Sequence, residues 1–224
     1  MGRDDQPKER QRRQLERKTG RRPGFDRLLI VTEGSRTEPG YFREIIADHR
    51  LPSAHVVVSP SLLGTDPRQV VDYAQDLFLR GDPHRRLAPK VYDRVYAVFD
   101  RDDHRSFHDA LARARAIDGT LKNDLRQRVR FEAVSSRPCF EFWLLLHFED
   151  VQHLMPRDEL TQRLKRHIPG YTKGHTGLYA ATKPRLPTAI DRARALAARV
   201  DLADDTEPYT GLFLLVELLV NMRV

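Results

Sequence analysis

Cysteine and long apolar runs are almost missing from this chain. A single cysteine among 224 residues cannot form an internal disulfide, so a reducing, cytoplasmic environment is expected. The longest apolar stretch near the C-terminus, GLFLLVELLV at 211–220, is too short to cross a bilayer and contains Glu217. The N-terminus is highly charged and lacks the apolar segment of a signal peptide. We therefore expect a cytoplasmic protein with no membrane association.

Positive charge is plentiful but unevenly spread. The net charge is +7, and residues 1–24 contain nine basic and four acidic side chains, so most of the excess lies there. This arm has too few apolar residues to pack, and we expect it to be flexible or a solvated helix. Such an arm could hold phosphates of nucleic acid or could simply be a solubilising tail. The candidate nucleic-acid-binding residues are Arg12, Arg13, Arg17, Lys18, Arg21 and Arg22.

Strand-like and helix-like segments alternate through the first 150 residues. The pattern predicts strands at 27–32, 55–60, 93–100 and 129–136, with helices at 37–50, 65–80, 106–117 and 139–148. Strands separated by amphipathic helices pair mostly in parallel, with right-handed crossovers. Residues 25–150 are therefore expected to form an α/β core, a mostly parallel sheet flanked by helices.

The remaining residues, 151–224, show no clear strand. Three segments have helical patterns, at 159–168, 187–200 and 211–220, and we expect a helical C-terminal extension packed on the core. The segment 169–187 is rich in Gly, Pro and Lys, which predicts a loop between helices. Such a loop could be mobile and functional, although a plain connector is more usual.

Acidic residues follow three of the predicted strands. Glu33 stands before Gly34 after the first strand, Asp100 and Asp102 end the third, and Glu141 begins the helix after the fourth. The carboxyl ends of parallel strands meet at one edge of a sheet, and alternate strand residues share a face. Converging carboxylates repel one another unless a cation is present. Mg²⁺ or Mn²⁺ is the expected cation because both prefer oxygen ligands, and the chain has no zinc-type Cys/His spacing.

Three motifs in this order give the chain a resemblance to a known family. VTEGSRTEPGYF, then YAVFDRDD, then SSRPCFEFWLLLHF resemble the RloB family, a TOPRIM-like group related to the OLD nucleases and encoded in bacterial restriction and defence loci. The likeness covers about residues 25–220, with GYTKG and PYTGLFLLVELL also in the family's style. Arg137 departs from the pattern, since an asparagine is usual before this proline, which puts in doubt only the role of a side-chain amide there.

The resemblance implies a TOPRIM-like fold whose acids bind two Mg²⁺ or Mn²⁺ ions for phosphodiester hydrolysis. Carried onto this chain, the metal ligands are Glu33, Asp100 and Asp102, with Glu141 completing the shell. Glu33 could instead act as a general acid or base. Glu38 matches the second acid of OLD-like members, and Lys173 could neutralise transition-state charge. The catalytic residues implied are therefore Glu33, Glu38 and Lys173.

Structural explanations remain open for several of these residues. Glu38 could be a helix-start acid favoured by the helix dipole, Lys173 a solvated loop lysine, and Glu141 a polar residue at a helix start. His104, beside Asp102, could assist proton transfer, but such a residue is more often merely exposed.

The resulting expectation is a metal-dependent endonuclease, acting on DNA or RNA as an effector of anti-phage defence. The resemblance also implies an ABC- or AAA-type ATPase partner. The C-terminal helices could offer it a docking surface, form a homodimer seam, or be buried within the fold. The alternatives are a non-catalytic nucleic-acid-binding subunit of an ATPase complex, or another TOPRIM phosphotransfer activity. A cluster of intact acids favours catalysis, because a purely phosphate-binding surface would avoid negative charge.

Overall fold

The computed structural model describes residues 25–200 and 207–222. It confirms the expected class, an α/β fold with a mostly parallel sheet, flanking helices and C-terminal helices. The basic arm lies outside the described residues, so its predicted contact with nucleic acid stays a prediction. Of the helices in the described ranges, none is both long and apolar enough to cross a membrane.

Within the described residues, five strands form one sheet in the order β2-β1-β3-β4-β5. They are β1 (Leu28–Thr32), β2 (Val56–Pro60), β3 (Arg94–Asp100), β4 (Arg130–Arg137) and β5 (Tyr209–Thr210). The first four strands pair in parallel, and β5 runs antiparallel to the end of β4. The expectation of no strand beyond residue 150 is therefore wrong. A two-residue strand is too short to show a period, and Thr210 is held by a 3.0 Å hydrogen bond between its hydroxyl and that of Ser136.

The predicted helices are present with small shifts at their ends. Those of the α/β part are α2 (Thr37–Asp48), α3 (Pro67–Arg80), α4 (Phe107–Ile117) and α5 (Phe140–Leu146). Those of the C-terminal part are α6 (Arg157–His167), α7 (Leu178–Thr182), α8 (Leu186–Ala197) and α9 (Leu212–Val220). Helix α7 lies inside the segment 169–187 that was expected to be a loop, which corrects that prediction. Its five residues are fewer than two turns, too few for a helical period to be recognised.

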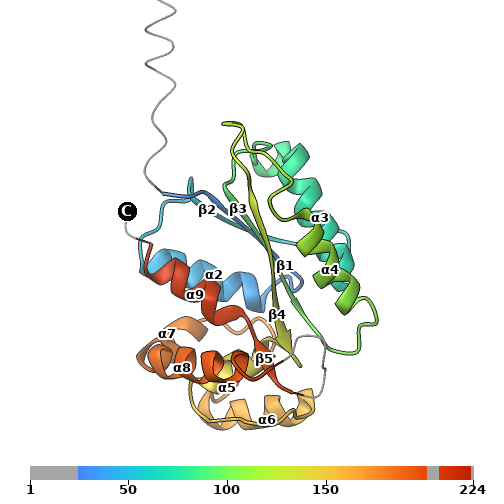
Figure 1. The fold of residues 1–224 in the computed structure, drawn as a ribbon. Helices are drawn as coiled ribbons and strands as arrows, with labels where there is room; N and C mark the ends of the chain where they lie inside the picture. Colours follow the sequence, from blue (N-terminus) through green and yellow to red (C-terminus); the bar gives the residue numbers. More distant parts are fainter. Residues whose placement is uncertain (1–24, 201–206, 223–224) are drawn as a thin grey trace, which may run out of the picture.

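Helices cover both faces of the sheet. Leu29 and Val31 of β1 belong to the hydrophobic cluster that includes α3 and α4, whereas Leu28 and Ile30 belong to the cluster that includes α2 and α9. Figure 1 shows these two helix pairs on opposite sides of the strands. Because successive strand residues point to opposite faces, the continuous apolar run of β1 is buried from both sides.

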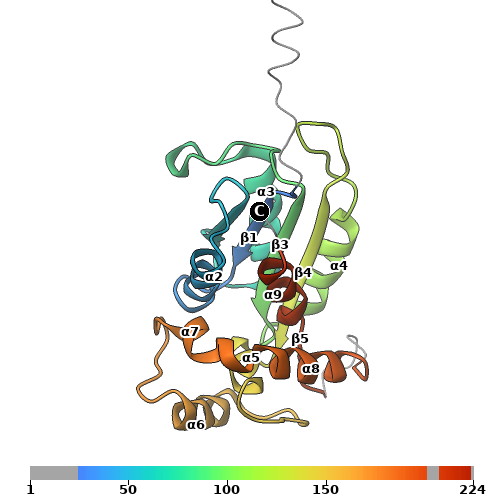
Figure 2. The same ribbon diagram turned by 90° about the vertical axis from the view of Figure 1, so that its left-hand side faces the viewer.

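The carboxyl ends of the parallel strands point towards the group formed by α5, α6, α7 and α8 (Figures 1 and 2). One hydrophobic cluster extends from Phe42 of α2 through Trp143 of α5 to Leu160 of α6 and Ala193 of α8. The C-terminal helices thus lie next to the edge at which the acids follow their strands. The division into a core of residues 25–150 and an extension of residues 151–224 stays a prediction.

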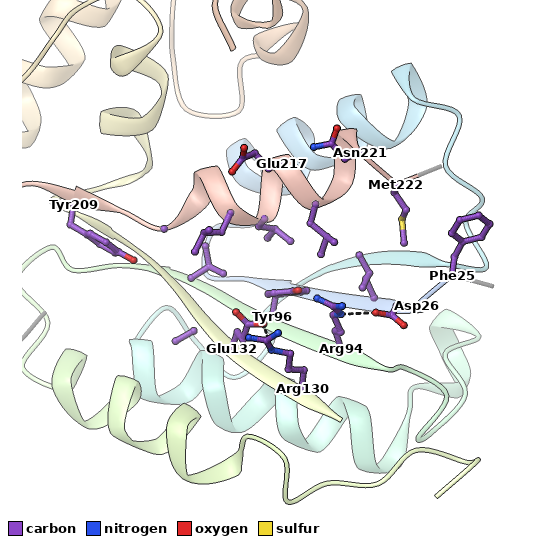
Figure 3. A pocket seen from close by; sticks show the side chains of 17 residues that line it. Phe25, Asp26, Arg94, Tyr96, Arg130, Glu132, Tyr209, Glu217, Asn221 and Met222 are labelled. Atoms are coloured by element: carbon purple, nitrogen blue, oxygen red, sulfur yellow. Dashed lines mark hydrogen bonds and ion pairs between the residues drawn. The ribbon is translucent and has the colours of Figure 1, made fainter. Parts of the chain in front are cut away.

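A groove of about 770 Å³ lies between α9 and the sheet (Figure 3). It extends from the amino ends of β1, β3 and β4 to Tyr209 of β5, and Tyr96 and Met222 line it. Most apolar side chains of α9 are buried, but Leu214 is 56% exposed. A docking role for the C-terminal helices, in a homodimer or with an ATPase, stays a prediction.

Candidate metal centre

The turn after β1 fixes the carboxylate of Glu33. The backbone N–H of Glu33 continues the sheet by donating to the carbonyl oxygen of Val98 at 2.8 Å. Its Oε2 accepts a hydrogen bond from the backbone N–H of Asp100, also at 2.8 Å. The hydroxyl of Thr32 donates to the carbonyl oxygen of Gly34 at 2.9 Å and closes the turn. The carboxylate that follows β1 therefore lies against the end of β3.

Asp100 and Asp102 come together, but not for the reason that the sequence suggested. Asp100 is the buried last residue of β3, while Asp102 lies beyond the strand in a turn with φ of +34°. The guanidinium of Arg101 donates to the carbonyl oxygens of Asp102 and His104, at 3.2 and 2.9 Å. The backbone N–H of Asp102 donates to the carbonyl oxygen of Pro138 at 3.1 Å. The turn, rather than strand alternation, brings Asp102 to the site.

Glu141 reaches the same place from α5. It is the second residue of that helix, and the whole residue is only 3% exposed. Its Oε1 accepts a 3.0 Å hydrogen bond from the hydroxyl of Tyr171. Its Oε2 is buried and accepts no hydrogen bond from any described residue. A buried carboxylate oxygen without a hydrogen bond is costly and requires positive charge nearby, which the guanidinium of Arg157 provides at 3.5 Å.

Arg157, the first residue of α6, lies among these acids and was not predicted. Its Nη1 is 2.5 Å from Oδ2 of Asp102, and its Nη2 is 3.8 Å from Oδ2 of Asp100 and 3.5 Å from Oε2 of Glu141. No motif marks it in the sequence. The available signal was indirect, because several buried acids require positive charge and any of the 39 Lys and Arg residues could supply it.

Glu38, in the first turn of α2, folds back over Gly34. A Cβ atom at Gly34 would lie only 1.9 Å from Oε2 of Glu38. The glycine after β1 therefore leaves space for a second carboxylate beside that of Glu33. Glu38 does more than complement a helix dipole, because its half-buried carboxylate is near enough to Glu141 and Glu33 for their charges to raise its pKa.

Burial and mutual repulsion raise the pKa values of these carboxyl groups. Burial, aided by the charge of Asp102, raises the pKa of Glu33 to about 7. Burial and the charges of Glu141 and Glu33 raise the pKa of Glu38 to about 7. Burial and the charges of Glu38 and Glu33 hold the pKa of Asp100 well above its usual value. Such a group gains by taking up protons or a cation.

Glu33, Asp102 and His104 could hold a metal ion together. Each offers one ligand atom, and these three atoms lie within 4.8 Å of one another. Nε2 of His104 is 3.8 Å from Oε1 of Glu33. The predicted convergence of the acids after the first and third strands is thus present. Asp100 and Glu141, the other two predicted ligands, lie beside this triad around Arg157. His104 was considered only for proton transfer, and its place depends on the turn after β3.

Lys173 lies on the rim of the same site. It lines a hollow of about 450 Å³ together with Glu141 and Arg157, and its charge acts to lower the pKa of Glu33. Its loop is attached to α2, since the backbone N–H of Gly174 donates to the hydroxyl of Thr37 at 2.9 Å. The acidic group, Arg157 and Lys173 are therefore neighbours in this fold, whereas their catalytic roles stay predictions.

Replacing Gly34 by alanine should displace the carboxylate of Glu38 without unfolding the protein. The new methyl group would meet the flexible end of the Glu38 side chain, not backbone, so the chain itself need not move. We expect the affinity for Mn²⁺ to fall about tenfold or more, as for a lost ligand-orienting contact, while the melting temperature changes little. The matched control is Gly40→Ala, because a Cβ at Gly40 meets no atom within 4 Å. Equal Mn²⁺ affinities of the two variants, measured by calorimetry, would contradict this role of Gly34.

Comparison with known proteins yields one match. The family model described as RloB-like protein matches residues 28–219. No curated protein and no solved structure matches the chain. The matched range contains all the acids described above, together with Arg157 and Lys173. The chain belongs to the RloB-like protein family.

Proposed function

We propose that this protein hydrolyses phosphodiester bonds of nucleic acid with divalent metal ions. The observation that carries the proposal is the meeting of ligand atoms from Glu33, Asp102 and His104 within 4.8 Å, beside further buried acids. Membership of the RloB-like family supports it. Structural acids normally pair one to one with cations, whereas here the carboxylates outnumber the guanidinium that they share.

The side chains present fit such ions. Glu33, Asp102 and His104 would hold one ion. The proposed place of a second is between Asp100 and Glu141, where the guanidinium of Arg157 now lies 3.8 and 3.5 Å from their oxygens. Carboxylate oxygens suit Mg²⁺ and Mn²⁺, and a histidine ligand favours Mn²⁺ of the two. Bound ions of this kind stabilise charge on a transferring phosphoryl group and lower the pKa of a bound water.

The protein's own groups supply proton transfer and positive charge. Glu33 and Glu38 each have a pKa of about 7, which is where a general base works best near neutral pH. Arg157 of α6 and Lys173 of the following loop lie beside Glu141, and both can pair with non-bridging phosphate oxygens. Glu33 is both a candidate ligand and a candidate base. Of its two carboxylate oxygens, Oε2 already accepts a hydrogen bond from the backbone N–H of Asp100.

The cellular setting is a second part of the proposal. The resemblance to defence-associated proteins supports an effector that acts with an ATPase of the ABC or AAA type. A non-catalytic nucleic-acid-binding subunit remains the competing function. It would bind nucleic acid equally well in EDTA and would never cleave it.

The deciding experiment compares cleavage of RNA and DNA by the wild type and by Glu33→Ala. We expect cleavage in Mn²⁺ or Mg²⁺, no cleavage in EDTA, and a loss of about 10²–10⁴-fold in the variant. Asp191→Ala is the matched control, since its side chain is 77% exposed on α8. Metal-dependent cleavage that survives in Glu33→Ala would refute the proposed site. An absence of cleavage by the wild type on every substrate would refute the proposed activity of the isolated chain.

A further inference from the structure

A hollow of about 870 Å³ opens directly beside the metal centre. It shares the side chains of Asp102, His104 and Arg157 with that centre. Four apolar residues, Pro138, Leu154, Met155 and Pro156, form one wall, and three charged residues, Arg101, Asp103 and Arg137, complete the lining. Leu154 is 40% exposed, although most large apolar side chains in the described residues are buried. The acids therefore border a solvent-accessible pocket with one apolar wall.

The size and lining of this pocket suit a nucleobase. Pockets for small ligands usually measure about 300–1,000 Å³ and combine apolar walls with a few polar groups. Arg137 also lines the pocket and is only 1% exposed, so its positive charge is buried behind the wall. A base has flat apolar faces and a polar edge, and it is commonly bound between apolar side chains with hydrogen bonds to that edge.

The other side of the metal centre has a different lining. The hollow of about 450 Å³ that contains Lys173 also contains Lys165, and Arg157 borders both hollows. Two lysines favour phosphate oxygens over bases. The acids thus lie between a pocket with one apolar wall and a basic hollow, an arrangement that suits a single strand crossing the site.

We propose that the 870 Å³ pocket holds one unstacked nucleotide next to the bond that is cut, so that the substrate is single-stranded nucleic acid. This inference rests on the proposed function and adds the substrate class to it. A paired base inside a duplex cannot enter such a pocket without being extruded, which costs a few kcal/mol. Unpaired strands meet no such cost, and stacked or pocketed bases add about 1–3 kcal/mol each.

Binding can test this independently of cleavage. Fluorescence anisotropy with Ca²⁺ would measure the affinity for labelled single-stranded RNA and DNA and for their blunt duplexes. Leu154→Glu introduces a negative charge at the pocket, and we expect it to weaken single-strand binding about 10–100-fold. Leu125→Glu is the matched control, because Leu125 is 54% exposed in the loop before β4, at the opposite end of that strand from the acids. Affinity for Mn²⁺, measured by calorimetry, should be unchanged in Leu125→Glu and should not fall in Leu154→Glu, whose new carboxylate lies beside the metal centre.

The outcomes separate this inference from the proposed function. Wild-type binding that favours single strands at least about tenfold, lost in Leu154→Glu alone, supports the pocket even if the isolated chain cleaves nothing. Equal binding of single strands and duplexes, or equal binding by the two glutamate variants, overturns it even if metal-dependent cleavage is found. The RNA and DNA arms identify which strand is preferred.

Discussion

Asp102→Asn is expected to weaken Mn²⁺ binding by at least about 100-fold, because Asp102 belongs to both candidate ligand sets. It is in the triad with Glu33 and His104, and it is also half of the Asp-x-Asp pair that the sequence indicated. The amide is nearly the same size as the carboxylate but carries no charge, so it removes one negative ligand without leaving a cavity. Isothermal titration calorimetry with Mn²⁺ would measure the change, and cleavage should be lost in parallel.

The neighbouring Asp103→Asn provides the control for Asp102→Asn. Asp103 is exposed, lies outside the triad and carries the same charge one residue further along the turn. Its replacement should change Mn²⁺ affinity less than about threefold, as expected for a screened surface charge. Similar losses in both variants would mean that net charge, rather than ligation, attracts the ion, and would contradict the triad. Wild-type affinity in Asp102→Asn would exclude Asp102 from the centre.

The meeting of the acids could be predicted because it depends on topology. Once β1 and β3 are recognised as parallel neighbours, Glu33 and Asp100 must follow their strands at the same edge of the sheet. The hydrogen bond from the backbone N–H of Asp100 to the carboxylate of Glu33 is a direct result of that register. The strand pattern in the sequence and the parallel sheet of the fold agree here, so the sequence could indicate that Glu33 and Asp100 meet.

The positions of Arg157 and His104 could not be predicted in the same way. Arg157 follows Asp102 by 55 residues and reaches it only because α6 packs against α5 near the end of the sheet. His104 is placed by a turn in which Asp102 adopts positive φ and Arg101 binds two carbonyl oxygens. Neither feature leaves a period or a spacing in the sequence. They are tertiary contacts, which override local propensity.

Arg157→Met is expected to have the opposite effect to Asp102→Asn, tightening Mn²⁺ binding by about tenfold at about pH 8. The guanidinium lies 2.5–3.8 Å from three of the carboxylates that would ligate an ion, so it competes with the ion for them. Two unit charges 4 Å apart interact by about 4 kcal/mol near a protein surface, and partial exposure of Arg157 reduces this. Methionine keeps the aliphatic bulk and removes the competing charge. The control is Arg163→Met on the same helix, where the arginine pairs with Glu149 instead.

The metal-free stability of Arg157→Met provides a second test with a defined sign. Glu33 and Glu38 have pKa values of about 7 in the folded protein against an ordinary 4.5, so they keep their protons in the fold when the unfolded chain has lost them. Their burial therefore costs stability as pH rises from about 4.5 to 7, and Arg157 offsets the cost once they are ionised. The variant should lose more melting temperature, relative to wild type, at about pH 8 than at about pH 5. Arg163→Met should show no such difference. An equal loss at both pH values, or weaker Mn²⁺ binding in Arg157→Met, would mean that Arg157 helps to build the metal centre and does not occupy it.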